Sequence, residues 1–303
     1  MKILNFGSCN IDYVYSLDHI VKIGETQTTH RLETFPGGKG LNQSVALAKA
    51  GAKVYHAGCV GKDSEMLADT LAKNGVDISY LQTVDAKNGH AVIQVSDKGE
   101  NSIFLYPGSN EMISEAFVDS VIKDFDAGDF LVLQNEINNV DYIVNKAYER
   151  EMCIILNPSP FNKRIYDIDF NKLSYIVLNE VELGEISGNT QPKEGLTYLK
   201  NKYPWLKVIL TLGENGSVFT DGEVELYQSA FKIKVVDTTA AGDTFMGYFV
   251  AELSKGTDYA KALKIASAAS AITVSREGAA PSIPKRSEFE AMYPTLKENT
   301  FGV

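Results

Sequence analysis

YIVLN, at residues 175–179, is one of four short, nearly continuous apolar runs that decide the fold class of this chain. The other three are DFLVLQ at 129–134, CIILN at 153–157 and VILTL at 208–212. Runs of this kind are typical of strands buried on both faces, as in a parallel sheet. Helical segments, such as 140–149 and 194–202, lie between them and supply the crossovers. We therefore predict an α/β fold of the doubly wound type, with a mainly parallel sheet flanked by helices.

The part of the chain before residue 129 follows a different pattern. Its strand-like segments IDYVYSL (11–17), HAVIQVS (90–96) and NSIFLY (101–106) alternate or are rich in aromatic and β-branched residues. No helix separates the last two, and DKGE at 97–100 predicts a hairpin turn between them. We interpret the stretches at about 11–35 and 88–107 as the strands of a small sheet that projects from the main body as a lid.

Length and composition fit one large α/β domain with an appendage, spanning residues 1–303. Hydrophobic residues make up 44% of the 303 residues and charged residues 22%, which is ordinary for a globular protein. The net charge of −10 argues against a nucleic-acid partner and against binding to an acidic membrane surface. An anionic substrate would therefore need a local source of positive potential.

The cysteines and the N-terminus indicate the compartment. Cys9, Cys59 and Cys153 lie far apart and form no Cys-x-x-Cys motif, so we interpret them as buried thiols in a reducing compartment. The first residues lack the pattern of a signal peptide, and no apolar run reaches membrane-spanning length. We expect a cytoplasmic protein.

Polar residues stand where the predicted buried strands end. Glu136, Asn157, Asn179 and Thr211 occupy such positions, and Gly213 follows shortly after the last of them. A single residue of this kind is most often part of a turn. Ligands of open parallel sheets, however, bind at the carboxyl ends of the strands, so four successive strand ends indicate a site. The chain has neither a Gly-x4-Gly-Lys-Ser/Thr loop nor a Gly-x-Gly-x-x-Gly fingerprint, which argues against P-loop enzymes and dehydrogenases.

The segment VDTTAAGDTF at 236–245 is suited to phosphate chemistry. The small residues Ala240, Ala241 and Gly242 allow close backbone approach, and a helix from about 242 to 253 would open with free N–H groups. Those groups would hold a phosphoryl group during transfer, and Asp243 would accept the proton of an attacking hydroxyl. The structural alternative is that Asp243 caps the helix.

Two further motifs carry polar residues suited to a sugar. In FPGGKGLNQS, Gly37 and Gly38 permit close approach to a ligand, Lys39 supplies positive charge, and Asn42 follows Gly38 by one helical turn. In SCNID, Asn10 and Asp12 are two residues apart in an extended segment, so their side chains face the same way. An amide beside a carboxylate can bind vicinal hydroxyls. The alternative for this pair is two solvated residues on a lid strand.

Together these motifs resemble those of the ribokinase/PfkB family of carbohydrate kinases, and the resemblance covers nearly the whole chain. The first family signature matches from GGKGLNQS at 37–44 through Gly51 and Gly61, and the second matches DTTAAGD at 237–243. Two positions depart from the family pattern. Tyr248 stands where a small residue is expected, and Met246 stands where asparagine is usual among the ribose kinases.

The resemblance implies a role for each matching residue. Asp243 would be the catalytic base, beside an anion hole formed by the amides of Ala240, Ala241 and Gly242. The sugar would be bound by Asn10, Asp12, Gly38, Lys39, Asn42 and Glu136. Asn179 and Glu182 match an Asn-x-x-Glu motif that organises magnesium and phosphates, and Thr211, Gly213 and Gly216 would line the nucleotide site. A monovalent-cation site would comprise Asp237, Thr239, Thr273, Arg276, Gly278 and Ser282.

The expected activity is therefore ATP-dependent phosphorylation of a sugar hydroxyl, with D-ribose converted to D-ribose 5-phosphate. Mg²⁺ would bridge the phosphates of ATP, and K⁺ would activate the enzyme. The alternatives are a family member acting on a nucleoside, a fructose or a deoxysugar, and a non-catalytic sugar or nucleotide sensor. The exposed edges of the small sheet are suited to pairing two chains, which predicts a homodimer through the lid.

Overall fold

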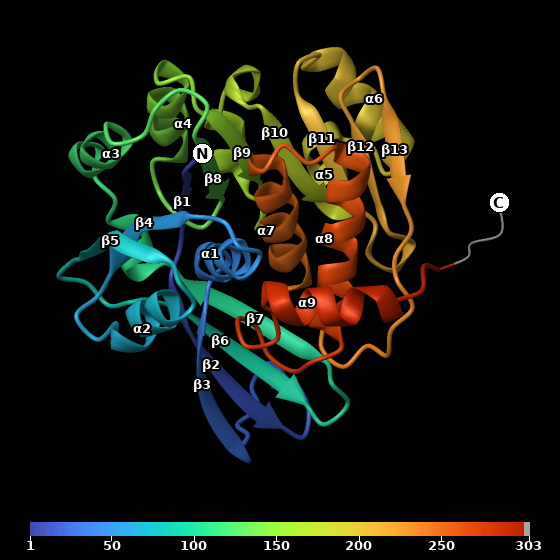
Figure 1. Cartoon of the computed structure of the whole chain (residues 1–303). Coiled ribbons are helices and arrows are strands. Elements are labelled where there is room, and N and C mark those ends of the chain that lie inside the picture. The colour runs from blue at the N-terminus through green and yellow to red at the C-terminus, as the bar shows by residue number, and fades with distance from the viewer. Residues whose placement is uncertain (300–303) are drawn as a thin grey trace.

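The computed structural model describes residues 1–299 and places their strands in two sheets (Figure 1). The larger sheet has nine strands in the order β13-β12-β11-β10-β9-β8-β1-β4-β5. Their bounds are β1 (Ile3–Phe6), β4 (Val54–Val60), β5 (Asp77–Thr83), β8 (Phe130–Gln134), β9 (Cys153–Asn157), β10 (Tyr175–Asn179), β11 (Lys207–Thr211), β12 (Ser217–Thr220) and β13 (Glu225–Gln228). Pairing is parallel from β5 across to β11, and β12 and β13 add an antiparallel edge.

Helices cover both faces of this sheet, which confirms the predicted doubly wound arrangement. The helices are α1 (Lys39–Lys49), α2 (Glu65–Lys73), α3 (Glu115–Ile122), α4 (Val140–Glu149), α5 (Glu180–Ser187), α6 (Pro192–Lys202), α7 (Ala241–Ser254), α8 (Tyr259–Val274) and α9 (Arg286–Met292). Short 3-10 turns lie at Gly108–Glu111, Lys163–Asp167, Phe170–Lys172, Gly213–Asn215 and Tyr293–Thr295.

Successive strand residues feed two separate cores. In β9, Ile155 packs into the core formed with α1, α7 and α8, whereas its neighbours Ile154 and Leu156 pack into the core formed with α3 to α6. Because every residue of the strand centre is buried on one face or the other, the sequence shows a continuous apolar run rather than an alternating one.

The smaller sheet has the strand order β3-β2-β6-β7 and projects from one end of the molecule (Figure 1). Its strands are β2 (Asn10–Leu17), β3 (Arg31–Gly37), β6 (Gly89–Ser96) and β7 (Asn101–Tyr106). The outer pairs are antiparallel, and the central pair of β2 and β6 is parallel. This is the projecting sheet that the sequence predicts, and we refer to it as the lid.

The sequence pattern did not reveal that β1, β4 and β5 belong to the larger sheet. β1 lies between β8 and β4, as the third strand from the β5 edge of the sheet, and is entirely buried. Two polar residues interrupt the apolar runs there: Asn5 in β1 and His56 in β4, both fully buried. None of the helices within residues 1–299 is long and apolar enough to cross a membrane.

Candidate active site

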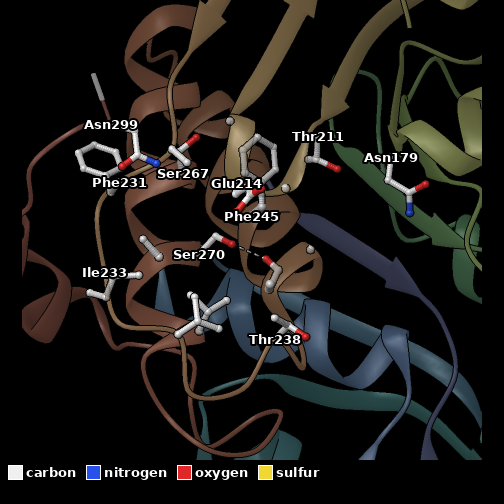
Figure 2. A pocket seen from close by; sticks show the side chains of 18 of the residues that line it. Asn179, Thr211, Glu214, Phe231, Ile233, Thr238, Phe245, Ser267, Ser270 and Asn299 are labelled. Atoms are coloured by element: carbon white, nitrogen blue, oxygen red, sulfur yellow. Dashed lines mark hydrogen bonds between the residues drawn. The ribbon is translucent and has the colours of Figure 1, made fainter. Parts of the chain in front are cut away.

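A cavity of about 890 Å³ lies where β10 and β11 end and α7 begins. All four residues predicted to bind nucleotide line it: Asn179, Thr211, Gly213 and Gly216. Asn179 and Thr211 are the last residues of β10 and β11 and form one side of the cavity in Figure 2, with Phe231 on the opposite side. The cavity walls include the apolar side chains of Phe231, Ile233 and Phe245. The strand ends therefore form a pocket with an apolar part and a polar edge.

The first turn of α7 presents backbone amides at this cavity. Ala240 has φ of 59°, a left-handed conformation that costs a residue with a Cβ roughly 1–2 kcal/mol. Ala241 and Gly242 line the cavity. The amide of Ala241 donates to the Thr238 carbonyl oxygen at 3.2 Å. Within residues 1–299 the amides of Gly242 and Asp243 have no such partner. The strained turn thus leaves donors free at a helix N-terminus, where an anion is favoured.

Ser270 of α8 holds this turn from the other side. Its hydroxyl donates to the carbonyl oxygen of Ala241 at 2.9 Å, the bond drawn as a dashed line in Figure 2. A side chain added at Gly242 would meet no atom within 4 Å, so this residue faces open space. The turn is therefore supported from behind and open toward the cavity.

Asp243 does not cap α7. Its side chain is only 7% exposed, and the helix N-terminus has no side-chain cap. The carboxylate instead accepts hydrogen bonds from two successive residues of α1: Asn42 Nδ2 reaches Oδ2 at 3.2 Å, and Gln43 Nε2 reaches Oδ1 at 2.9 Å. The close approach of α1 and α7 depends on Gly247, because a methyl group there would overlap Ala46.

The residues predicted to bind sugar converge near this carboxylate. The backbone amide of Lys39 donates to Glu136 Oε2 at 2.9 Å, and Ser8 Oγ donates to the same oxygen. Gly38, at the start of α1, has φ of 91°, which favours glycine. Asn42 belongs to the same helix turn and contacts Asp243. The start of α1 thus joins the predicted sugar residues to the predicted base.

Lys39 supplies the positive charge of this region. Burial favours the neutral amine and by itself lowers the pKa of Lys39. The net pKa is nevertheless raised, because three nearby carboxylates favour the charged ammonium: Asp243, Glu136 and Glu182. A chain of net charge −10 therefore keeps a buried cation beside Asp243, the predicted base.

Two carboxyls of the predicted sugar-binding set, Asp12 and Glu136, have raised pKa values. Burial, and secondarily the charge of Glu136, raises the pKa of Asp12 to about 7. Burial also raises the pKa of Glu136, although Lys39 and Ser8 oppose that effect. Both shifts mean that the carboxylate forms are short of solvation and suited to accepting hydrogen bonds from a ligand.

Asn10 is buried rather than solvated, with 4% of its surface exposed. Its Oδ1 accepts a hydrogen bond from Asn110 Nδ2 at 2.7 Å. In the lid, Asn10 pairs with Gly37 on one side and Gly89 on the other. A side chain at Gly37 would overlap the carboxylate of Asp12, and one at Gly89 would overlap Asn10 and Asn110. These glycines make room for the polar pair.

The predicted cation-site residues lie on two adjoining segments. Asp237 Oδ1 accepts from the backbone amide of Thr239 at 2.9 Å and from its hydroxyl at 2.6 Å, and Oδ2 accepts from the amide of Gly278 at 2.9 Å. Burial alone would raise the pKa of Asp237, but these hydrogen bonds outweigh it and lower the pKa. The second segment is held together by Arg276, whose amide donates to Thr273 O at 3.0 Å and whose guanidinium donates to Ser282 O at 3.4 Å.

The Asn-x-x-Glu motif forms the start of α5. Glu182 donates its backbone N–H to Asn179 Oδ1 at 2.9 Å, and Asn179 donates its backbone N–H to Glu182 Oε2 at 3.0 Å. This reciprocal capping box fixes both side chains at the carboxyl end of β10, beside the cavity.

Comparison with known proteins identifies the family. The family model described as pfkB family carbohydrate kinase matches residues 1–286. This chain belongs to the pfkB family of carbohydrate kinases. The family resemblance seen in the sequence motifs is thereby confirmed.

Individual members of the pfkB family align with this chain along nearly its full length. Ribokinase of Bacillus subtilis is 32% identical over 290 residues, covering 94% of this chain and 97% of its own. A ribokinase of Cryptococcus neoformans in complex with ADP has a TM-score of 0.85 at 33% identity, covering 96% of this chain and 99% of its own. Ribokinase of Arabidopsis thaliana, complexed with ribose and ATP, has a TM-score of 0.84 at 26% identity, with coverages of 96% and 97%.

The structure adds residues that the sequence motifs did not single out. Gln43 shares the Asp243 carboxylate with Asn42, and Asn110 holds the amide of Asn10. Gln43 stands beside Asn42 within the first pfkB signature, but nothing in its residue type marked it. The departures from the family pattern are accommodated in the core. Tyr248 is fully buried and donates its hydroxyl to Pro284 O at 2.8 Å, and Met246 is also buried.

Proposed function

We propose that this carbohydrate kinase transfers the terminal phosphoryl group of ATP to the 5-hydroxyl of D-ribose. The observation that carries the proposal is the position of Asp243. Its carboxylate contacts Asn42 of the sugar-binding set, while its backbone belongs to the helix turn that opens on the large cavity. A hydroxyl held by the first group and a phosphate held by the second would meet at this carboxylate.

Asp243 acts as the base in this scheme. It takes the proton from the sugar hydroxyl as the hydroxyl oxygen forms a bond to the terminal phosphorus and the bond to the bridging oxygen breaks, releasing ADP. The amides at Ala240, Ala241 and Gly242 would stabilise the negative charge on the transferring group, and for this the Ala241 amide would exchange its 3.2 Å bond to Thr238 O for one to the phosphate. Positioning and charge stabilisation account for the rate enhancement.

The polar groups around Lys39 bind the sugar. Asp12 and Glu136 offer acceptors for ribose hydroxyls. Donors come from Lys39, from the backbone at Gly38 and from Asn10 Nδ2, since Asn10 Oδ1 already accepts from Asn110. Asn42 supports this assignment, because its Oδ1 is buried and has no hydrogen-bond partner within residues 1–299. A buried acceptor without a partner is unfavourable unless a ligand satisfies it.

The cavity holds ATP. Its volume of about 890 Å³ and its apolar walls suit a nucleobase and ribose, and Asn179, Thr211, Gly213 and Gly216 edge the path toward α7. The ADP complex of the Cryptococcus relative and the ribose and ATP complex of the Arabidopsis relative support both ligands.

The donor set near the phosphate path fits two cations. Asn179 and Glu182 would hold Mg²⁺ with ATP, which would neutralise phosphate charge. Carboxylate and carbonyl oxygens at Asp237, Thr239, Thr273, Arg276, Gly278 and Ser282 fit a hard cation such as K⁺. We propose that K⁺ there offsets the charge of Asp237 and keeps the turn at Ala240 in shape.

The lid would close over the sugar and exclude water, so that ATP is not simply hydrolysed.

We also propose that two chains pair through the lid. Its edge strand β7 exposes Ile103, Phe104 and Leu105, each about half exposed, and a free edge strand is suited to association. Light scattering on the purified protein measures this directly. A single catalytic domain acting in the cytoplasm remains our proposal from the sequence.

A coupled ADP-release assay tests the substrate. Ribose, deoxyribose, fructose, adenosine, uridine and pseudouridine are compared with Mg²⁺ and K⁺ present, and ribose should give the highest kcat/KM. A higher value for a nucleoside or another sugar would replace ribose as the substrate. Measurable sugar binding without ADP release on any of the six would instead support a non-catalytic sensor.

A further inference from the structure

A chain of buried side-chain amides runs behind Asp243. Gln43 of α1 contacts Gln134 at the end of β8, and Gln134 contacts Asn5 of β1. These three residues are at most 1% exposed. Buried polar groups are costly unless they are hydrogen-bonded, and apolar side chains would fill this space more simply. The chain therefore calls for a functional explanation.

The hydrogen bonds fix which end of the Gln43 amide faces Asp243. Gln134 Nε2 donates to Gln43 Oε1 at 2.7 Å, so the carbonyl end of Gln43 points away from Asp243. The Nε2 end then donates to Asp243 Oδ1 at 2.9 Å. If the Gln43 amide were flipped, its oxygen would face the Asp243 carboxylate and its nitrogen would face the donor nitrogen of Gln134. Both contacts would be repulsive.

Asn157 enforces the same orientation from the other side. Its Nδ2 donates to Val177 O at 2.9 Å, which turns its Oδ1 toward Gln43. Gln43 Nε2 donates to that oxygen at 3.3 Å. The amide is therefore set by an acceptor on one flank and a donor on the other, both at strand ends of the larger sheet.

A glycine beside Gln134 leaves room for this series of buried amides. A side chain at Gly7 would overlap Gln134 Oε1 and the backbone of Gly40. Gln134 Oε1 itself is buried without a hydrogen-bond partner within residues 1–299. Gln134 Nε2 thus donates to both Asn5 and Gln43, while its own Oε1 stays buried without a partner, which is energetically unfavourable.

We propose that Gln43 is a positioning residue for the catalytic carboxylate, an inference that rests on the proposed role of Asp243 as base. Gln43 holds Oδ1 while Asn42 contacts Oδ2, so the carboxylate cannot rotate about its Cβ–Cγ bond. The remaining lone pairs then stay directed at the sugar hydroxyl. Gln43 itself does not touch the substrate; it acts through Asp243.

The test is the Gln43→Met variant, which keeps the length of the side chain and removes the donor. A hydrogen bond to a charged group corresponds to roughly a 10- to 100-fold effect. We expect kcat to fall by that factor, with KM for sugar and for ATP within about three-fold of wild type. The matched control is Ile143→Val in the opposite core, which removes one buried methylene and should leave kcat unchanged.

A double-mutant cycle separates positioning from general packing. In an Asp243→Asn background, adding Gln43→Met should change kcat by less than about three-fold, because the oriented group is already lost. Gln43→Glu adds a second negative charge against the base and should move the acid limb of the pH–rate profile to higher pH. If Gln43→Met folds poorly, Gln134→Met provides the second variant, since it frees the Gln43 amide without touching Asp243.

The outcomes distinguish the two proposals. Near-wild-type kcat in Asp243→Asn overturns the assignment of the base itself. A large loss in Asp243→Asn with an unchanged kcat in Gln43→Met, or additive losses in the double variant, overturns the positioning role alone.

Discussion

Sugar affinity should depend on pH through Asp12. Burial and the neighbouring Glu136 raise the pKa of this carboxyl to about 7, so the group is half protonated near neutral pH. If the ionised form accepts hydrogen bonds from the sugar, only that form binds well. The apparent Kd for the sugar is then proportional to 1 + 10^(pKa − pH), where the pKa is that of Asp12. From about pH 8 to about pH 6, the Kd should rise roughly ten-fold.

Calorimetric titration with ribose alone measures this effect, because nucleotide phosphates titrate in the same range. Asp12→Asn keeps the size of the side chain and cannot titrate, so its Kd should be weak and constant across the range. Glu136→Gln removes the secondary cause of the shift and should move the midpoint to lower pH. A Kd for the wild type that is flat between about pH 6 and pH 8, or that improves as pH falls, would refute the reasoning.

The same shift has a consequence for stability. The pKa of Asp12 rises from an ordinary value of 3.8 to about 7 on folding, so the folded state binds this proton more tightly than the unfolded state. The Asp12 carboxylate therefore lowers the free energy of unfolding fully above about pH 7. This destabilisation shrinks as pH falls and disappears below the pKa of 3.8 that the group has in the unfolded state. Asp12→Asn should raise the melting temperature at about pH 8 and change it little at about pH 4. Equal changes at both pH values would show that the carboxylate is not destabilised by burial.

Two further variants test the remaining assignments. Asp243→Asn removes the base while keeping its size, so kcat should fall roughly 10² to 10⁴-fold with little change in sugar affinity; activity within a few-fold of wild type would exclude Asp243 as the base. Activity should rise with K⁺ and much less with Na⁺ at constant ionic strength, and Asp237→Ala should abolish that response while circular dichroism shows an intact fold. Equal rates in K⁺, Na⁺ and a bulky organic cation would indicate general screening instead.

The strands from residue 129 onward could be predicted because burial on both faces leaves a continuous apolar run. β9 and β10 have the predicted bounds, and β11 begins one residue earlier than VILTL suggests. The lid strands were also accessible, since aromatic and β-branched residues flank a recognisable turn at 97–100. What the pattern could not give is the parallel pairing of β2 with β6, because that depends on how segments nearly eighty residues apart come together.

The candidate site was predictable where one motif holds several of its residues. Gly38, Lys39 and Asn42 come from one helix turn, and Ala240 to Asp243 from another. The contact between the two turns was not predictable. Asn42 and Asp243 are 201 residues apart in the sequence, and their hydrogen bond exists only because α1 packs against α7. The raised pKa of Asp12 likewise depends on burial that no local pattern reveals.

β1 and β4 lack a continuous apolar run because each contains a buried polar residue that belongs to the same hydrogen-bond network as Asp243. Asn5, which interrupts the apolar run of β1, accepts from Gln134 and donates to Ser44 Oγ at 2.8 Å. Ser44 Oγ lies 2.8 Å from Nδ1 of His56, the residue that interrupts β4. Burial lowers the pKa of His56 to about 4, so the imidazole is neutral at assay pH and adds no charge to the core.

Apolar side chains at these positions of β1 and β4 would be less costly to bury if the two strands had only a packing role. Their hydrogen bonds instead continue through Gln134 and Gln43 to the carboxylate of Asp243. A sequence that specifies one fold breaks its local rules mainly where function requires it. If Asp243 is the base and Gln43 positions it, as we propose, β1 and β4 lack a continuous apolar run because they anchor the amides that orient this carboxylate.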